Sequence, residues 1–330
     1  IFFFFFTCNA PTERGYRAAQ QAFAEISQSH NVNDTLRTMF GEQRRRIAES
    51  LELPDGTEVV LCPSGSDAEY IPIAIARALG ASNRIVNVVT QVKEIGAGSS
   101  VAAQGKYFST HAPLTGRLPK GEHQLAGFDN VTCVNIPARE RDGSVLDAAA
   151  LVAEFVRQAE EDGAFPIVHG VFGGKTGLRD GTMPDSKDSG RSSLGVVDAC
   201  QGRFALEELN EWLEQDSITL FTASKFYQAP PFCGAVLVPK RIAEQVRDLP
   251  VPKPIAMFSS SGLGGFLTDK ELPDCMDSWR PLLSNNTDIE GNVGLALRWE
   301  AGLAEMEALS SVPDTIRTQA CDEWATRVAD

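Results

Sequence analysis

Apolar runs and helical stretches alternate along most of the chain. The runs at 58–62, 84–90 and 195–199 are short and almost uniformly apolar, which is typical of strands buried on both faces of a sheet. Further strands are expected at 131–136, 166–171, 218–222 and 234–238, and helices within 12–50 and at 68–79, 148–159, 206–214 and 294–309. This alternation predicts an α/β fold, a doubly wound and mainly parallel sheet with helices on both faces.

The same pattern divides the chain into four segments. An N-terminal segment, 1–35, precedes a large domain at 36–250. Residues 251–285 are rich in Pro, Gly and Ser and are expected to form a loop region, which is a frequent place for function. The final segment, 286–330, begins with an apolar helical stripe of Leu295, Trp299, Leu303 and Met306.

Composition and charge narrow the class of protein. The net charge of −14 argues against nucleic acid or an anionic membrane surface as a partner. The apolar run at 1–6 is too short to span a membrane. Seven cysteines without a CxxC pair and four unclustered histidines suggest neither a disulfide framework nor a metal site. We therefore expect reduced thiols and a cytoplasmic protein.

The first stretch with candidate chemistry is Ser64-Gly65-Ser66, between a predicted strand and a predicted helix. Backbone N–H groups at a helix start can bind a phosphate, a serine hydroxyl can add a hydrogen bond, and glycine allows close approach. The same turn is also an ordinary serine N-cap, and in isolation this second interpretation is favoured.

Asp198 and Lys225 each follow a predicted buried strand. A carboxylate there is costly to leave unpaired, so Asp198 is expected either to meet a cation, such as a protonated ring nitrogen, or to cap a helix. Lys225 has the apolar neighbours Phe221, Phe226 and Tyr227 and lies where such folds place their sites. A desolvated lysine is a nucleophile toward aldehydes, whereas the alternative is a solvated surface lysine.

Taken in order, these stretches resemble a known family. The Ser-Gly-Ser turn, the strand end Asp198-x-x-Gln201 and the stretch 222–239 (TASKFYQAPPFCGAVLVP) are similar to class V aminotransferases of the pyridoxal 5'-phosphate (PLP) fold-type I enzymes, a family that includes cysteine desulfurases. The resemblance covers about residues 35–310. It implies that 36–250 is a PLP-binding domain, and that 286–330 is an interdomain helix and the start of a C-terminal small domain that is largely missing.

The resemblance also implies roles for individual residues. Lys225 would form a Schiff base with PLP and then move protons at the substrate α-carbon. Asp198 would pair with the ring nitrogen, and Gln201 would hydrogen-bond the ring hydroxyl. The residues implied to hold the cofactor phosphate are Gly65, Ser66, Thr222, Ser224 and, reaching the partner subunit of a homodimer, Thr287.

The chain departs from the family pattern at three places. Ser224 stands where the family usually has histidine before the lysine. The segment 92–98 lacks the ring that usually stacks on the cofactor, and the candidates to replace it are Tyr107, Phe108 and His111. The segment 173–177 (GGKTG) has glycine in place of the usual asparagine, and its Lys175 is expected in solvent rather than facing a substrate.

The expected function is that of a homodimeric PLP-dependent enzyme acting on a small amino acid or amine. Transamination is the first expectation, and a cysteine desulfurase or other carbon–sulfur lyase is the second. A non-catalytic protein of the same fold is the alternative from another class, but the presence of both Lys225 and Asp198 favours an enzyme. A dinucleotide-binding domain is rejected, because the Gly96-x-Gly98 pair has Val101 where a third glycine is required.

Overall fold

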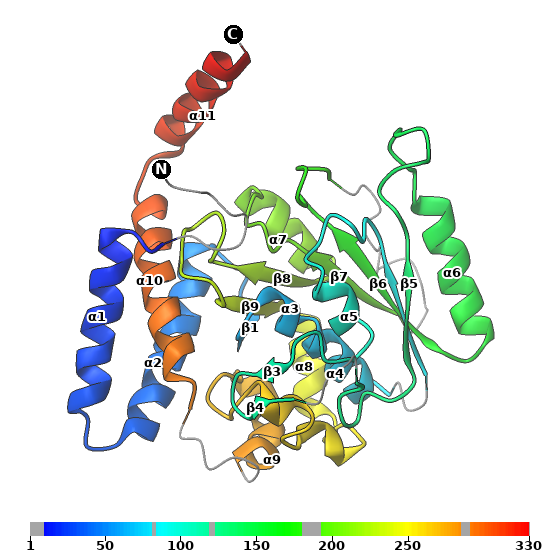
Figure 1. Cartoon of the computed structure of the whole chain (residues 1–330), viewed down its shortest axis with the longest axis horizontal. Coiled ribbons are helices and arrows are strands. Elements are labelled where there is room, and N and C mark those ends of the chain that lie inside the picture. The colour runs from blue at the N-terminus through cyan, green and yellow to red at the C-terminus, as the bar shows by residue number, and fades with distance from the viewer. Residues whose placement is uncertain (1–9, 81–83, 119–122, 180–192, 285–290, 330) are drawn as a thin grey trace.

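A single seven-stranded sheet forms the centre of the protein. The computed structural model describes residues 10–80, 84–118, 123–179, 193–284 and 291–329 (Figure 1). The strand order is β1-β9-β8-β7-β6-β2-β5. The bounds are β1 Glu58–Cys62, β2 Ile85–Val89, β5 Val131–Asn135, β6 Phe165–Val171, β7 Leu194–Asp198, β8 Ile218–Thr222 and β9 Gly234–Val238. Only β9 runs antiparallel to its neighbours, so the predicted mainly parallel α/β fold is confirmed.

The strand directions bring distant segments to one edge of the sheet. Because β9 is antiparallel to both β1 and β8, these two strands run in the same direction. Gly234, at the start of β9, pairs with Cys62 at the end of β1 and with Thr222 at the end of β8. Val171 in turn pairs with Asp198. The segments that follow β1, β6, β7 and β8 therefore meet at the carboxyl edge, where ligands bind in open α/β sheets.

Helices cover both faces of this sheet. The bounds are α1 Glu13–Gln28, α2 Val32–Ser50, α3 Gly65–Ala68, α4 Tyr70–Ala78, α5 Ser99–Ala102, α6 Ala149–Glu161, α7 Leu206–Glu214, α8 Lys240–Asp248, α9 Arg280–Ser284, α10 Val293–Ser310 and α11 Asp314–Ala329. Val60, Leu220 and Val236 pack on the face of α4 and α8, whereas their neighbours Leu61 and Phe221 pack on the face of α2, α7 and α10. This alternation follows from the two-residue period of a strand, and because both faces are covered it explains why the runs are mostly apolar.

The first two helices pack with a late helix, α10, on one side of the sheet. Helices α1, α2 and α10 lie side by side, and α11 extends away from them (Figure 1). The hydroxyl of Thr12, before α1, donates to Glu305 in α10 at 2.6 Å. Arg46 of α2 forms an ion pair of 2.8 Å with Glu300 of α10. Helices α1 and α2 near the start of the chain are thus bound to α10 near its end.

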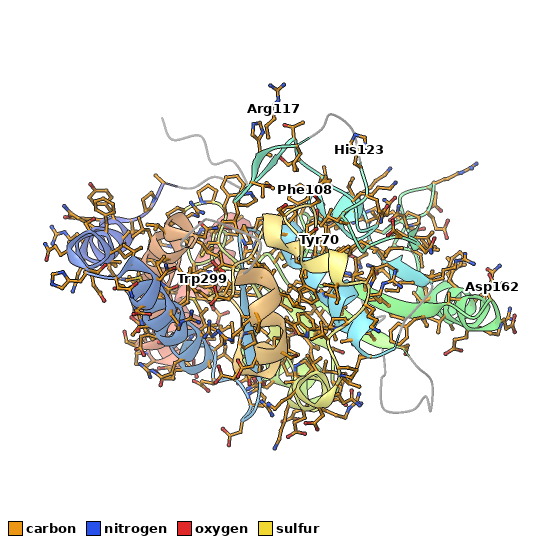
Figure 2. All side chains as sticks on the ribbon, turned by 90° about the horizontal axis from the view of Figure 1, so that it is seen from below. Tyr70, Phe108, Arg117, His123, Asp162 and Trp299 are labelled. Atoms are coloured by element: carbon orange, nitrogen blue, oxygen red, sulfur yellow. The ribbon has the colours of Figure 1, made fainter. Side chains whose placement is uncertain are left out.

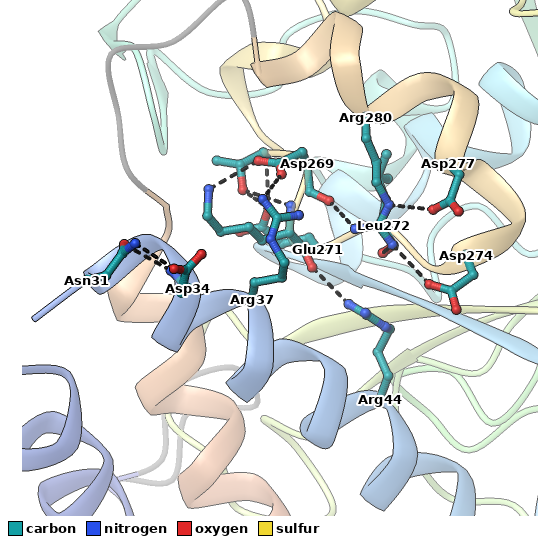
Figure 3. A network of polar contacts seen from close by, with 12 residues as sticks. Asn31, Asp34, Arg37, Arg44, Asp269, Glu271, Leu272, Asp274, Asp277 and Arg280 are labelled. Atoms are coloured by element: carbon teal, nitrogen blue, oxygen red, sulfur yellow. Dashed lines mark hydrogen bonds and ion pairs between the residues drawn. The ribbon is translucent and has the colours of Figure 1, made fainter. Parts of the chain in front are cut away.

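Residues 251–284, nearly all of the expected loop region, contain short helices and buried side chains. They form η1 (Ile255–Phe258), η2 (Leu263–Gly265), η3 (Asp274–Trp279) and then α9. Figure 3 shows how α2 holds this segment: Arg37 pairs with Asp269 at 2.8 Å, and Arg44 donates to the carbonyl of Lys270 at 2.8 Å. The N–H of Leu61 also donates to the carbonyl of Glu271 at 3.1 Å. The segment is therefore fixed beside β1.

Several elements differ from the sequence-based expectation. The helix expected at 68–79 is divided into α3 and α4 at Glu69. Helices α5, α8, α9 and α11, the short helices η1, η2 and η3 within the expected loop region, and the small hairpin of β3 (His111–Ala112) and β4 (Gly116–Arg117) were not predicted. The short elements carry too few residues to give a periodic pattern. By contrast, the bounds of β1, β8, β9 and α7 agree with the expected ranges.

Candidate active site

A cavity of about 250 Å³ opens at the carboxyl edge of the sheet. Its wall contains every described residue that the sequence implied for cofactor binding: Gly65, Ser66, Asp198, Gln201, Thr222, Ser224 and Lys225. Thr287 lies outside the described residues. The remaining wall comes from Ser64, Glu94, Ile95, Gly96, Ser99, Phe108, Val171, Phe172, Gly174, Cys200, Pro231 and Phe232. The fold thus gathers side chains from the ends of four strands into one space.

The serine turn after β1 is packed tightly against the neighbouring strand ends. Ser64 caps α3: its hydroxyl accepts from the N–H of Asp67 at 3.1 Å and donates to the Asp67 carboxyl at 2.5 Å. The capping interpretation is therefore correct for Ser64. A side chain on Gly65 would meet Cys200 Sγ at 2.8 Å and Thr222 Cγ2 at 2.9 Å. Glycine at this position lets the turn lie against β7 and β8.

Two hydroxyls at this end of the cavity face each other. Ser66 follows the cap, and its hydroxyl lies 3.1 Å from that of Ser99, at the start of α5. On the other wall, Ser224 donates to the hydroxyl of Thr222 at 3.4 Å, and Thr222 donates to the carbonyl of Cys200 at 2.8 Å. Four hydroxyl groups therefore surround the space above Gly65. This donor set suits an anion such as a phosphate ester.

Asp198 supplies a buried negative group to the same cavity. It ends β7, is only 5% exposed, and accepts from the N–H of Cys200 at 2.9 Å. Burial is the main cause that raises the pKa of the Cys200 thiol; Asp198 raises it further, whereas Lys225 lowers it. The carboxylate and the ammonium therefore both lie near this thiol. Asp198 is placed to meet a cationic group of a ligand between them.

Lys225 is carried by a loop that the rest of the protein holds in a strained shape. Gln228 (φ 54°) and Phe232 (φ 70°) both adopt the left-handed conformation that non-glycine residues usually avoid. Arg298 of α10 donates to the carbonyl of Phe232 at 2.8 Å. A side chain on Gly302 of α10 would meet the Cβ of Ala223 at 3.0 Å, so this helix packs directly on the loop. Such support fixes the position of Lys225 over the cavity.

The structure identifies which of the three candidate stacking residues reaches the cavity. Of the three candidates, Phe108 lines it, and its ring stacks on Tyr70 with 6.4 Å between centroids (Figure 2). Tyr107 instead packs inward and donates to the carbonyl of Ser261 at 2.5 Å. His111 is exposed in β3. Phe108 contacts Gly98, where a side chain would lie 2.7 Å from its ring.

Glu94 is a cavity residue that the sequence did not single out. It is 7% exposed, and its carboxylate accepts from the N–H of Thr176 at 2.7 Å and from the Thr176 hydroxyl at 3.0 Å. It occupies the space beside Gly174, where an added Cβ would lie 2.5 Å from the Glu94 Cβ. Lys175 points outward and donates to the carbonyl of Lys93 at 3.1 Å, as the solvated interpretation expected.

Two more buried polar residues were missed, Glu69 and His169. They lie beside Asp198 and are 1% and 0% exposed. The signal for His169 was a single ionisable residue inside an apolar strand. Glu69 gave no signal, since the sequence placed it within a continuous helix.

The comparisons with known proteins support the fold. No family model and no curated protein sequence matches the chain. Among solved structures, it resembles a TDC from Oryza sativa with PLP and tryptamine (TM-score 0.51, 14% identity, 88% of this chain and 59% of that chain). It also resembles tryptophan decarboxylase from Catharanthus roseus in complex with L-tryptophan (0.51, 11%, 92% and 60%) and cysteine desulfurase from Thermococcus onnurineus NA1 (0.50, 15%, 92% and 66%).

The likeness to these solved structures covers only part of their length. The chain spans between half and two thirds of the length of the solved structures it matches. Within the described residues, no helix has the length and apolar character needed to cross a membrane. With its strand order, single antiparallel strand β9 and helices on both faces, the chain has the α/β architecture of the PLP fold-type I proteins.

Proposed function

We propose that this chain is a PLP-dependent enzyme that binds its cofactor through Lys225 and acts on an amino acid or amine. The observation that carries the proposal is the cavity itself. It combines a lysine, a buried carboxylate, an amide and a set of hydroxyls, in a fold shared with proteins solved with PLP. Bound PLP would supply an electron sink for the substrate.

The residues of the cavity fit each part of this cofactor. Ser66, Thr222 and Ser224 supply hydroxyls for the phosphate, and the bare backbone at Gly65 allows it to approach. Asp198 supplies a buried anion for a protonated ring nitrogen, and Gln201 an amide for the ring hydroxyl. Phe108 supplies a ring for stacking.

Within this function Lys225 has two tasks. Its amine binds the cofactor aldehyde covalently, and after release it is the group that carries a proton to and from the substrate. Phe108 and Phe232 add apolar surface to the wall of the cavity around this amine. No other described lysine lines the cavity.

A spectrum and a peptide map test the proposal. The purified chain is mixed with PLP, its visible absorbance is recorded, and it is reduced with borohydride before mapping. We expect a visible band in the wild type and the pyridoxyl label on Lys225. Lys225→Ala should lose both, whereas the exposed control Lys175→Ala should keep both. A label on another lysine, or no band, contradicts the proposal.

The reaction type is a finer proposal, and transamination is our first candidate. Amino-acid decarboxylation and cysteine desulfuration are the other candidates, because the similar structures include decarboxylases and a cysteine desulfurase. Product analysis separates the three. Incubation with amino acids yields a keto acid in the first case, carbon dioxide and an amine in the second, and sulfide from cysteine in the third.

We also propose a cytoplasmic homodimer. Phe226 and Phe232 beside the cavity are 49% and 63% exposed, and a partner subunit would cover such apolar surface. The unpaired cysteines, among them the exposed Cys321, support a reducing compartment. Light scattering during size-exclusion chromatography tests the dimer, and a monomer that still binds PLP would contradict it.

A further inference from the structure

A buried polar group lies directly behind Asp198. One ring nitrogen of His169, one carboxyl oxygen of Glu69 and one of Asp198 lie within 4.8 Å of one another. His169 Nδ1 is 3.4 Å from Glu69 Oε2, and both side chains are 1% exposed. His169 comes from β6 and Glu69 from the break between α3 and α4. The cluster thus joins the helix after the serine turn to the strand end that carries Asp198.

These side chains lack other partners. Among the described residues, none forms a hydrogen bond with the side-chain nitrogens of His169 or the carboxyl oxygens of Glu69. A buried polar group without a partner is strongly unfavourable. The polar atoms that lie close together in this cluster are those of the pair itself and of Asp198. The backbone that carries the ring is held in place, because the carbonyl of His169 accepts from both the N–H (3.0 Å) and the hydroxyl (3.2 Å) of Thr90.

The protonation of the pair follows from its burial. Burial raises the pKa of Glu69 well above its ordinary value, and the charge of Asp198 adds to this effect. Burial lowers the pKa of His169 to about 4, against the opposing influence of Asp198. Both shifts favour the uncharged form of each side chain, so a neutral pair has a carboxyl proton to offer to the ring nitrogen 3.4 Å away.

The other ionisable groups around the pair do not supply a positive charge. Cys133 faces it from β5 and Cys200 from the end of β7, and burial raises the pKa of both thiols. Tyr70, next to Glu69 in sequence, likewise has its pKa raised, mainly by burial. Lys225 acts on Cys200 from the cavity side. Among the described groups around the pair, a positive charge therefore acts only from the cavity side.

We propose that Glu69 and His169 are positioning residues for Asp198, a neutral proton-sharing pair that orients this carboxylate and stabilises its single negative charge toward the cavity. The inference rests on the proposed function, in which Asp198 meets the ring nitrogen of PLP. A donor behind a carboxylate favours its charged form. Without the pair, Asp198 would take up a proton at higher pH and would bind a cationic ring less well.

Substitutions at Glu69 test this proposal. Glu69→Leu removes the donated proton at similar size, whereas Glu69→Gln retains a donor. We expect Glu69→Leu to weaken PLP binding by about ten-fold, as for the net loss of one hydrogen bond, because His169 loses the group that holds its ring beside Asp198. We also expect the acid-side loss of PLP affinity to move to higher pH. Glu69→Gln should restore both the affinity and the pH profile toward wild type.

The measurement is a PLP titration of each full-chain variant from pH 5 to 8, followed by the visible band. Thermal unfolding of the PLP-free proteins reports any purely structural effect, which would change stability but leave the pH profile unmoved. His169→Phe removes both ring nitrogens and should reproduce the Glu69→Leu result, which keeps the test valid if one variant fails to fold.

The outcomes separate the inference from the proposed function. A wild type without a band on Lys225 contradicts the proposed function. If the wild type shows that band, and if Glu69→Leu and His169→Phe bind PLP with the same affinity and pH profile as the wild type, only the inference is contradicted. Equal defects in Glu69→Gln and Glu69→Leu also overturn it. So would mass spectrometry that finds a metal ion held by wild type and lost in Glu69→Leu.

Discussion

Gly65→Ala tests how closely the serine turn is held against the strand ends. The new methyl group would lie 2.8 Å from Cys200 Sγ and 2.9 Å from Thr222 Cγ2. Unstrained contacts of this kind are about 3.5–4.0 Å, so the turn or its neighbours must move by about 0.7–1 Å. Such overpacking costs about 1–3 kcal/mol, and the better helix propensity of alanine recovers up to about 1 kcal/mol. We expect a net loss of about 1–2 kcal/mol in the free energy of unfolding.

Urea denaturation of the PLP-free protein measures this loss. Gly41→Ala in α2 is the matched control: its methyl would meet only Arg44 Nη2 at 3.9 Å, so it should stabilise the protein by about 0.5–1 kcal/mol. Thr222→Ser removes the contacted methyl but keeps the hydroxyl bound to the carbonyl of Cys200. The double variant should therefore recover at least about 0.5 kcal/mol relative to additivity. A Gly65→Ala protein as stable as wild type, or one without coupling to Thr222→Ser, would refute the packing argument.

Three further predictions follow from the same structure. Gly174→Ala places a methyl 2.5 Å from the Cβ of Glu94 and should cost about 1–3 kcal/mol in urea denaturation, whereas an unchanged midpoint would contradict the contact. Burial raises the pKa of Asp67 from 3.8 to about 7, so its contribution to stability is fully present below pH 3.8 and is lost as the pH rises through 7. Denaturation at a series of pH values should therefore show a decline of up to about 1.4 kcal/mol per pH unit in this window, and Asp67→Asn should flatten it. Arg298→Ala removes the bond to the carbonyl of Phe232 and should cost about 1 kcal/mol and speed limited proteolysis of the Lys225 loop, while equal cleavage rates would count against this support.

The local pattern of the sequence was sufficient for the fold class. Strands such as β1 and β8 are buried on both faces, so most of their residues are apolar, and this is visible in a short window of sequence. The position of Lys225 after such a strand was visible for the same reason. All seven described residues that the resemblance implied for the cofactor line one cavity.

The sequence did not predict the cavity residues that lie outside the recognised motifs. Glu94 fills the space above Gly174, and Phe108 reaches the wall from a segment whose alignment was open. Glu69 and His169 are 100 residues apart in the chain and meet only because α4 packs on β6. Their contact depends on which helices and strands pack against each other, and the local pattern of the sequence cannot predict this packing.

What the sequence by itself determined is therefore the set of elements and the chemistry at their ends. Buried side chains recur with the spacing of a helix or of a strand, and this spacing can be recognised within a short stretch of sequence. Only the tertiary structure decided the order of the strands, with β9 between β1 and β8, and the fastening of Thr12 to Glu305. These are long-range contacts, and they are settled by the packing of whole faces against each other rather than by any short stretch of residues.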